Sequence, residues 1–374
     1  MLLKFNKFLV LSISLFVLVF FYNISFAGKT VNINLQISKN TLYAANGTDS
    51  KNYSIPFRQD SNDNILNLNV TPGIGCAIFG GAGKGEIFNP NNPTTLLGDV
   101  RNNTLNVNCN IDDKCYLCGG ATSNGTVSRN TVNVYGGGSS TNTEAMVYGG
   151  RVFISGSAES NTVNIYKDFS CRSVAGGVVG NGISSFNTLN VFSKLNFFND
   201  RTTNLRGVYG GRVDGDGNSM NNSINVYGSI TAQRNVDISG GYVDRDGSAT
   251  SNRVNIAGTI HSGNWLNVYG GNVNVAGSAT SNRVNISGNI EAEGDIDITG
   301  GKGDDTAGNV VSISGKIGSS GGGTVTIAGS DGSKSAVNNK VIILETAELP
   351  EHSVLYGGSL LEAGVSLGNC LEVS

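Results

Sequence analysis

The sequence predicts an all-β protein, a right-handed parallel β-helix of about eleven coils with about 30 residues in each. Three observations lead to this prediction. A strand motif recurs along the chain, a glycine pair recurs in step with it, and the composition is rich in Gly and poor in charge (53 Gly, 14% charged residues). The right-handed sense follows from the general handedness of crossovers between parallel strands.

The strand motif is Asn-x-aliphatic-Asn-aliphatic, and it returns at intervals close to 30 residues. Two copies, at 248–256 and 278–286, are identical. The first Asn of each copy stands at Asn64, Asn103, Asn130, Asn161, Asn187, Asn222, Asn252, Asn282, Asn309, Asn339 and Asn369. Such a period is the signature of a solenoid, in which each unit buries its apolar face only against its neighbours.

Within each motif the side chains alternate with a period of two, which indicates a strand with one buried face. The positions two and four residues after the motif Asn are aliphatic in every copy, as at Val254 and Ile256. Stacked copies would lie about 4.8 Å apart and bury continuous aliphatic columns. The second Asn of the motif is then predicted to form an amide ladder between coils, at Asn106, Asn133, Asn164, Asn190, Asn225, Asn255 and Asn285.

The second landmark is a Gly-Gly pair, often preceded by Tyr, as at Gly210-Gly211 and Gly240-Gly241. We expect these pairs to supply positive-φ corners where the chain changes direction. The nearby tyrosines form either a structural stack or a binding face, and they are Tyr135, Tyr148, Tyr209, Tyr227 and Tyr269.

Three segments are expected along the chain. Residues 1–27 have the form of a signal peptide, with Lys4 and Lys7 before an apolar run and small residues at Ser25 and Ala27. An uncleaved anchor is the alternative, since the run is long enough to span a bilayer. Residues 28–63 form an atypical capping segment, and residues 64–374 form the repeat β-helix.

Composition restricts the choice of partners. The net charge is only -3, so nothing favours nucleic acid as a ligand. Low charge with abundant aliphatic residues also argues against a disordered chain.

Copies of Asn-x-Val-Asn-Ile and Tyr-Gly-Gly behind a signal peptide resemble the passenger regions of type V autotransporter adhesins of Gram-negative bacteria. The resemblance covers roughly residues 60–374. It implies export, display at the cell surface or outer membrane, and a C-terminal β-barrel in the full-length protein. No barrel sequence is present here, and the last repeat is cut off mid-strand at Ser374, so we expect a truncated product or a fragment of a longer gene.

An acidic column near the glycine pairs is the candidate metal site, and calcium is the ion that alternate oxygen ligands would favour. If coils stack in register, these carboxylates repel each other unless a cation intervenes. The alternative is a row of hydrated turn residues. The column comprises Asp214, Asp216, Asp244, Asp246 and Asp304.

Cysteines in an exported chain predict disulfides. Cys76 and Cys115 each stand four residues before a glycine, which favours a Cys76–Cys115 bridge between neighbouring coils, with Cys109–Cys118 as a companion. The spacing of Cys115 and Cys118 also suits zinc, but no second pair accompanies it.

Catalysis has little support in the sequence, since His261 and His352 lie near no nucleophile motif. The leading expectation is therefore an adhesin-like rod, not an enzyme, that binds a protein or glycan on host or neighbouring bacterial cells. Two alternatives stay open: a β-helix enzyme acting on polysaccharides, and a non-functional remnant of an autotransporter gene.

Overall fold

The computed structural model describes residues 30–33, 41–43, 62–69, 71, 77–83, 97–111, 115–137, 145–197, 207–360 and 364–374. The predicted signal peptide and most of the predicted cap lie outside these residues. The described part of the chain contains strands, turns and bends but no helix, and therefore no helix long and apolar enough to cross a bilayer.

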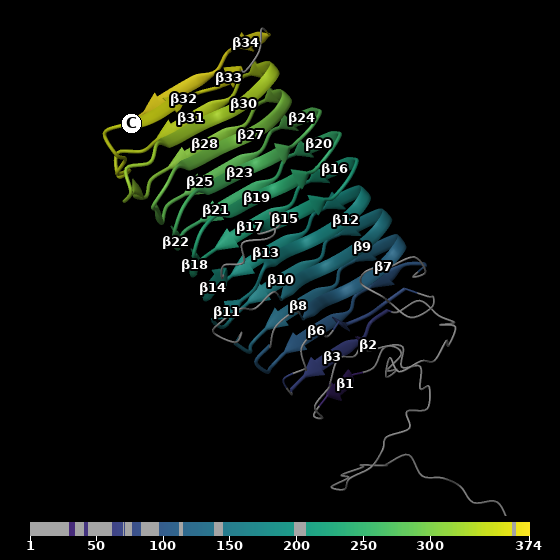
Figure 1. The fold of residues 1–374 in the computed structure, drawn as a ribbon. Helices are drawn as coiled ribbons and strands as arrows, with labels where there is room; N and C mark the ends of the chain where they lie inside the picture. Colours follow the sequence, from purple (N-terminus) through teal and green to yellow (C-terminus); the bar gives the residue numbers. More distant parts are fainter. Residues whose placement is uncertain are drawn as a thin grey trace, which may run out of the picture.

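The strands form three parallel sheets that run along one axis, with successive coils stacked from β1 to β35 (Figure 1). The first sheet contains β1 (Thr30–Ile33), β3 (Ile65–Leu68), β6 (Thr104–Val107), β8 (Thr131–Val134), β10 (Thr162–Ile165), β13 (Thr188–Val191), β17 (Ser223–Val226), β21 (Arg253–Ile256), β25 (Arg283–Ile286), β28 (Val310–Ile313), β31 (Lys340–Ile343) and β35 (Cys370–Val373). The second contains β11 (Phe169–Ser170), β14 (Lys194–Phe197), β18 (Ser229–Ala232), β22 (Thr259–Ser262), β26 (Asn289–Ala292) and β29 (Ile317–Ser319).

The third sheet is made of longer strands, several of which divide into two pieces in the middle coils. It contains β2 (Thr41–Tyr43), β4 (Ala77–Phe79), β5 (Val100–Arg101), β7 (Tyr116–Ser128), β9 (Met146–Glu159), β12 (Ser173–Ser185), β15 (Gly207–Val213), β16 (Gly217–Met220), β19 (Val236–Val243), β20 (Gly247–Thr250), β23 (Leu266–Val273), β24 (Gly277–Thr280), β27 (Ile296–Ala307), β30 (Val325–Val337), β32 (Ser353–Tyr356), β33 (Ser359–Leu360) and β34 (Val365–Leu367).

The predicted fold class is confirmed: the chain is an all-β solenoid whose repeats pair in parallel and in register. Each motif strand aligns residue for residue with the next, as β21 does with β25. The number of coils differs slightly from the prediction. The first sheet has 12 strands because β1 pairs with β3, whereas the second has 6, so fewer coils contain all three sheets.

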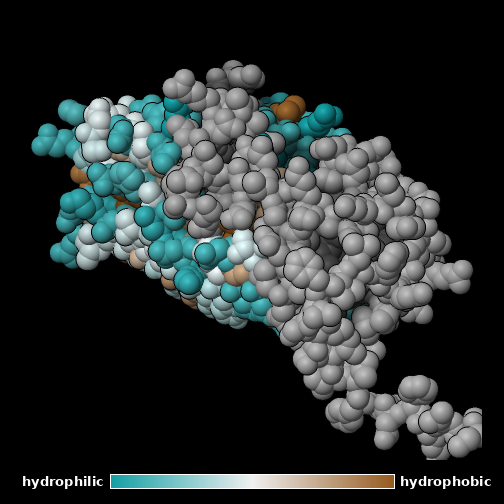
Figure 2. Space-filling view, turned by 60° about the horizontal axis from the view of Figure 1, so that its bottom comes forward, coloured by the Kyte–Doolittle hydropathy of each residue, from teal (hydrophilic) through white to brown (hydrophobic). Residues whose placement is uncertain are grey.

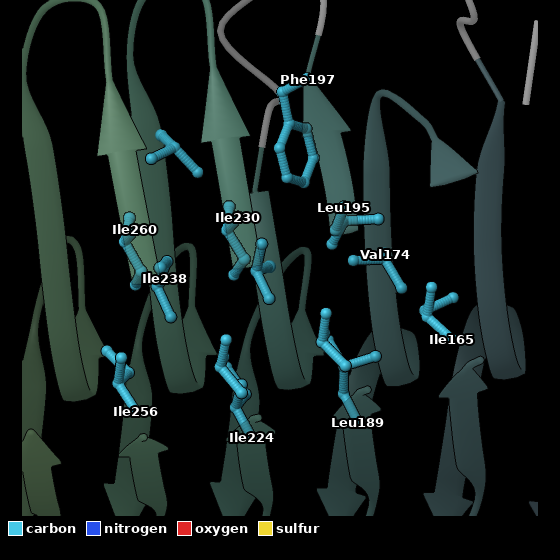
Figure 3. Close-up of a cluster of buried hydrophobic side chains, with 14 of the residues drawn as sticks. Ile165, Val174, Leu189, Leu195, Phe197, Ile224, Ile230, Ile238, Ile256 and Ile260 are labelled. Atoms are coloured by element: carbon cyan, nitrogen blue, oxygen red, sulfur yellow. The ribbon is translucent and has the colours of Figure 1, made fainter. Parts of the chain in front are cut away.

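The core is the dry interior enclosed by the three sheets. Both predicted aliphatic columns point into it, and their side chains from Leu66 to Ile343 are at most 6% exposed. Figure 3 shows how side chains of the three sheets meet, with Ile256 from the first, Ile260 from the second and Ile238 from the third. Burial of this continuous column is the main favourable term that holds the rod together.

The residue before each motif Asn makes the corner that leads into the first sheet. It adopts a left-handed conformation, with φ between 53° and 67°, from Asp63 to Gly368. In most coils it is not Gly, and Asn221 and Ser251 are examples. The corner turns the following Asn inward.

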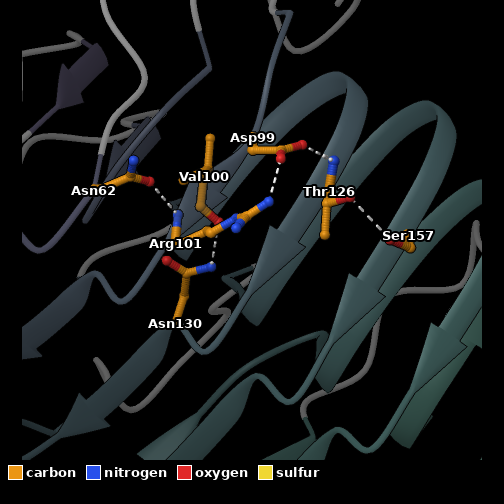
Figure 4. A network of polar contacts seen from close by, with 7 residues as sticks. All are labelled: Asn62, Asp99, Val100, Arg101, Thr126, Asn130 and Ser157. Carbon is orange, nitrogen blue, oxygen red and sulfur yellow. Dashed lines mark hydrogen bonds and ion pairs between the residues drawn. The ribbon is translucent and has the colours of Figure 1, made fainter.

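This inward-turned Asn forms a buried ladder that the sequence analysis missed. Each Nδ2 donates to the Oδ1 of the Asn in the next coil at 2.8–3.1 Å, from Asn64 to Asn369. From Asn130 onward, Nδ2 also donates to a main-chain carbonyl of the preceding coil, as Asn130 does to Val100 at 3.1 Å (Figure 4). From Asn64 to Asn339 the side chains are at most 1% exposed, so these bonds replace the hydrogen bonds that water would make.

The ladder predicted from the second Asn of the motif is present on the outer face of the first sheet. Each Nδ2 donates to the Oδ1 of the preceding coil at 2.7–2.9 Å, from Asn106 to Asn285. Its amides are partly buried and run opposite to the inner ladder.

The Gly-Gly pairs do not make positive-φ corners, and this prediction was wrong. The first seven pairs lie inside strands β7 to β27, and none of their glycines has a positive φ. A Cβ on Gly119 would lie 2.5 Å from the Gly149 carbonyl oxygen, and one on Gly120 would lie 2.7 Å from Cγ of Asn130. The pairs are needed because the buried asparagines and the next coil leave no room for a side chain.

The visible described surface is mostly hydrophilic, with hydrophobic residues scattered over it (Figure 2).

Candidate functional site

The outer face of the third sheet carries the main concentration of aromatic and charged side chains. In β15, Val208 points into the core, Tyr209 points outward, and Arg212 points outward again after the glycine pair. The Arg212 guanidinium lies 4.9 Å from the centre of the Tyr209 ring. Side chains on either side of the glycine pair therefore meet on one face of the sheet.

The tyrosine recurs every second coil. Its cation comes from the same strand in β9 and β15, whereas at Tyr269 it is Lys302 from β27 in the next coil. Tyr148, Tyr209 and Tyr269 occupy one register position in β9, β15 and β23, with Ala175 and Ser239 in the coils between them. A cation lies over each ring, at 5.8 Å for Arg151, 4.9 Å for Arg212 and 5.6 Å for Lys302. Two coils correspond to roughly 10 Å along the axis. We call Tyr148, Arg151, Tyr209, Arg212, Asp214, Tyr242, Tyr269 and Lys302 the tyrosine–cation band.

An ion triad lies in the N-terminal part of the band. Asp214 bridges Arg151 and Arg212, with Nη2–Oδ2 at 2.7 Å and Nε–Oδ1 at 2.5 Å. Burial opposes ionisation of Asp214, but the two arginines outweigh it and hold the pKa of this carboxyl below its ordinary value. The three side chains are only 17%, 11% and 29% exposed for Arg151, Arg212 and Asp214.

Beside the C-terminal part of the band lie two carboxylates that form no ion pair with any residue the structure describes. Asp237 accepts a hydrogen bond from Asn267 at 2.7 Å. Asp297 accepts from Thr299 at 2.7 Å and from the Tyr269 hydroxyl at 3.1 Å. Burial raises the pKa of both Asp237 and Asp297. Raised carboxyl pKa values occur at binding and catalytic sites, although they also occur in structural networks.

The tyrosines considered together in the sequence belong to two different surfaces. Tyr148, Tyr209 and Tyr269 are buried in the band, at 4–7% exposure. Tyr135 and Tyr227 instead lie just after strands of the first sheet and are about half exposed. There they form a second row with Tyr166 and Phe192, whose successive rings are parallel within 6° and 5.0–5.3 Å apart.

The structure does not gather the predicted calcium ligands. Within the described ranges, no group of three or more acidic, His or Cys side chains is arranged to hold a metal. Asp214 is paired with arginines, Asp244 accepts from the Tyr242 hydroxyl at 2.6 Å, and Asp216 and Asp246 are exposed. The last two are linked by the Asp246 N–H, which donates to Asp216 Oδ1 at 3.4 Å.

Asp304 does not continue this column, because its coil is shorter. Asn272 pairs with Lys302 and Ser278 pairs with Asp305, so residues 273–277 correspond to residues 303 and 304 alone. Asp304 thereby lies beside Gly277, and it is ion-paired with Lys334 at 2.7 Å.

The predicted Cys109–Cys118 bridge is not formed. Cys109 and Cys115 belong to the main core, whereas Cys118 lies on the opposite face of β7 and its thiol donates to the Gly120 carbonyl at 3.0 Å. Burial raises the pKa of this thiol to about 12, so it stays protonated. Cys76 lies outside the described residues, and its bridge to Cys115 stays a prediction.

His261 lies in β22 with Nδ1 3.8 Å from Glu291, and His352 is exposed. Neither belongs to the band. The band residues that the sequence analysis overlooked are its cations and Tyr242. The repeated string Tyr-Gly-Gly-Arg, at 148–151 and 209–212, was the available signal.

No known protein family, no curated protein and no solved structure matches this chain.

Proposed function

We propose that the chain is an exported, surface-displayed binding protein of the autotransporter-passenger type. In this role it attaches to a protein or glycan on host or neighbouring cells. A solenoid with one continuous core is stiff along its axis, and it presents the same surface position at regular intervals. Both properties suit a projecting rod that makes several contacts with an extended ligand.

The tyrosine–cation band is the observation that carries this proposal. Aromatic and Arg side chains dominate the energetics of recognition surfaces, and here they are held by strands and not by loops. The tyrosines recur every second coil, roughly 10 Å apart, and so offer similar positions to a repetitive polymer. The outer aromatic row suits saccharide stacking less well, because its ring faces already cover one another.

The test is binding of the purified, fluorescently labelled chain to intact cells and to a glycan array. The band variant Tyr242→Ala with Lys302→Gln should lose binding by a factor of at least about 10. The matched control, His261→Gln with Glu291→Gln, changes two outward residues of the second sheet and should bind normally. Equal loss in both variants, or no binding by the parent chain to any surface, would contradict the proposal.

A second candidate function, cleavage of a polysaccharide, is favoured by Asp237 and Asp297. Their register positions are two coils apart, or roughly 10 Å, which is near the upper end of the separation of about 6.5–9.5 Å in inverting glycosidases. The test is release of reducing ends from a panel of polysaccharides. Asp297→Asn should abolish any activity, and Asp304→Asn, at a carboxylate outside the band, should not. Absence of product from every polysaccharide would reject the hypothesis that the chain cleaves polysaccharides.

A further inference from the structure

The ion triad at the N-terminal part of the band joins two coils that are separated by one intervening coil. Arg151 and Arg212 occupy the same register position in β9 and β15, and the intervening strand β12 places Val178 between them. The tyrosines beside them are likewise separated by Ala175. Small residues in the middle coil allow both arginines to reach the one carboxylate of Asp214.

The charges of the triad do not balance. Among the described residues, Asp214 is the only carboxylate within ion-pair distance of either guanidinium. Two positive charges therefore share one negative charge at a sheltered position. Arg151 Nε is also buried and has no hydrogen-bond partner in the described structure. Buried charge without compensation is unfavourable, and an unpaired guanidinium donor adds to that cost.

We propose that this triad binds a monovalent oxyanion, and that the oxyanion is the carboxylate of an acidic sugar in the ligand. The inference rests on the proposed binding function and names its ligand class. One net positive charge matches one carboxylate, and planar guanidinium groups recognise planar carboxylates with paired N–H donors. Asp214, the most exposed of the three at 29%, marks the side from which the ligand reaches the arginines.

The experiment measures binding of small probes to the full chain by calorimetry. D-Glucuronate and D-galacturonate should bind, and D-glucose should not. Acetate and sulfate test whether the site recognises an acidic sugar or any small oxyanion. Binding of acetate or sulfate as tight as that of the hexuronates would reduce the site to a general anion site and overturn the sugar assignment.

Two variants change the charge in opposite directions. Arg212→Gln should weaken hexuronate binding by a factor of about 10 or more, because it removes a charge-assisted contact. Asp214→Asn should strengthen binding, because it removes the negative charge that competes with the ligand. A merely structural role of the triad predicts weaker binding for both variants, so weaker binding by D214N overturns the proposal.

Folding of each variant is checked by its melting temperature. Addition of hexuronate should raise the melting temperature of D214N more than that of the parent chain, since ligand binding stabilises the folded state. Asp304→Asn, which breaks the Lys334–Asp304 pair, is the matched control and should leave hexuronate affinity unchanged.

The outcome also separates this inference from the proposed function. Binding to cells that is insensitive to R212Q and D214N would overturn the triad as the ligand site and leave the adhesive role standing. Hexuronate binding with no attachment to any cell or glycan surface would overturn the adhesive role and leave the triad standing as an anion site.

Discussion

Two rows of asparagines run along the molecule, and in the coils from Asn64 to Asn285 they stand three residues apart. They differ in burial and in the groups that they hydrogen-bond. The inner row, from Asn64 to Asn339, is at most 1% exposed. Its amides tie the corner of each coil to both neighbouring coils. The outer row lies on the surface of the first sheet and links side chains only to each other. The comparison teaches that the stability contributed by a repeated Asn depends on how many buried main-chain groups it hydrogen-bonds.

Asn222→Ala should cause the largest loss of stability, about 4 kcal/mol. It removes the acceptor for the Asn187 main-chain and side-chain N–H groups and the donor to the Ser184 carbonyl, and all of these are buried. Chemical denaturation measures the change. A loss smaller than that of Asn225→Ala, the same substitution three residues later, would contradict the assigned difference between the rows.

Gly240→Ala should cost about 3 kcal/mol, as overpacking does in a rigid interior. The new Cβ would lie 2.6 Å from the carbonyl oxygen of Gly270, which is main chain and cannot move aside. The control is Gly318→Ala, where a Cβ meets nothing within 4 Å and the stability should stay the same or rise slightly. Equal effects at the two glycines would remove the steric explanation of the Gly-Gly pairs.

Asp214→Asn should cost about 2 kcal/mol at neutral pH, less than a fully buried ion pair, because the carboxylate is partly hydrated. The folded-state pKa of Asp214 is lowered. Its stabilisation is therefore present above the unfolded pKa, near 3.9, and is lost as the pH falls through the folded pKa. Denaturation at pH 7 and pH 3 measures this. The cost of N222A, an uncharged effect, should be the same at both pH values.

Asn225→Ala should cost about 1 kcal/mol, the net value of an ordinary hydrogen bond. Its amide donates to Asn190 and accepts from Asn255 in a half-buried position where water replaces the lost partners. The same denaturation series measures it. A loss equal to that of N222A would show that the outer row is as essential as the inner one.

Tyr227→Ser should have the smallest effect, about 0.5 kcal/mol for a single cross-strand contact. Tyr227 is 58% exposed and, among the described aromatic residues, stacks only on Phe192, at 5.3 Å. Thermal melting measures the change. A shift comparable with that of G240A would mean that the exposed aromatic row supports the fold.

The fold and the outer ladder could be predicted because both follow from a period of two inside a period of about 30. Val254 and Ile256 had to point to one side, and Asn255 therefore to the other. The inner ladder could not be predicted in this way. Asn252 faces the interior because Ser251 has a left-handed φ. Ser has no strong preference for the left-handed conformation, so the sequence does not indicate this turn.

The band was also hard to predict, because its contacts join residues from different coils. The distances of Asp214 in sequence from Arg151 and Arg212, 63 and 2 residues, do not reveal that one carboxylate bridges both arginines. The partnership depends on the register of β9, β12 and β15 and on the small side chain of Val178 in the middle coil. Likewise, Asp304 does not align with the other acidic residues, because its coil is shorter and the register shifts between Lys302 and Asp305.

Local alternation and repetition in the chain were sufficient to specify strands, their parallel stacking and the aliphatic core, because buried area depends on pattern alone. The roles of the paired glycines, the buried amides and the arginine–aspartate triad depended on three-dimensional packing. These roles arise from distances of a few ångströms between coils, and such distances exist only once the coils have stacked in one register.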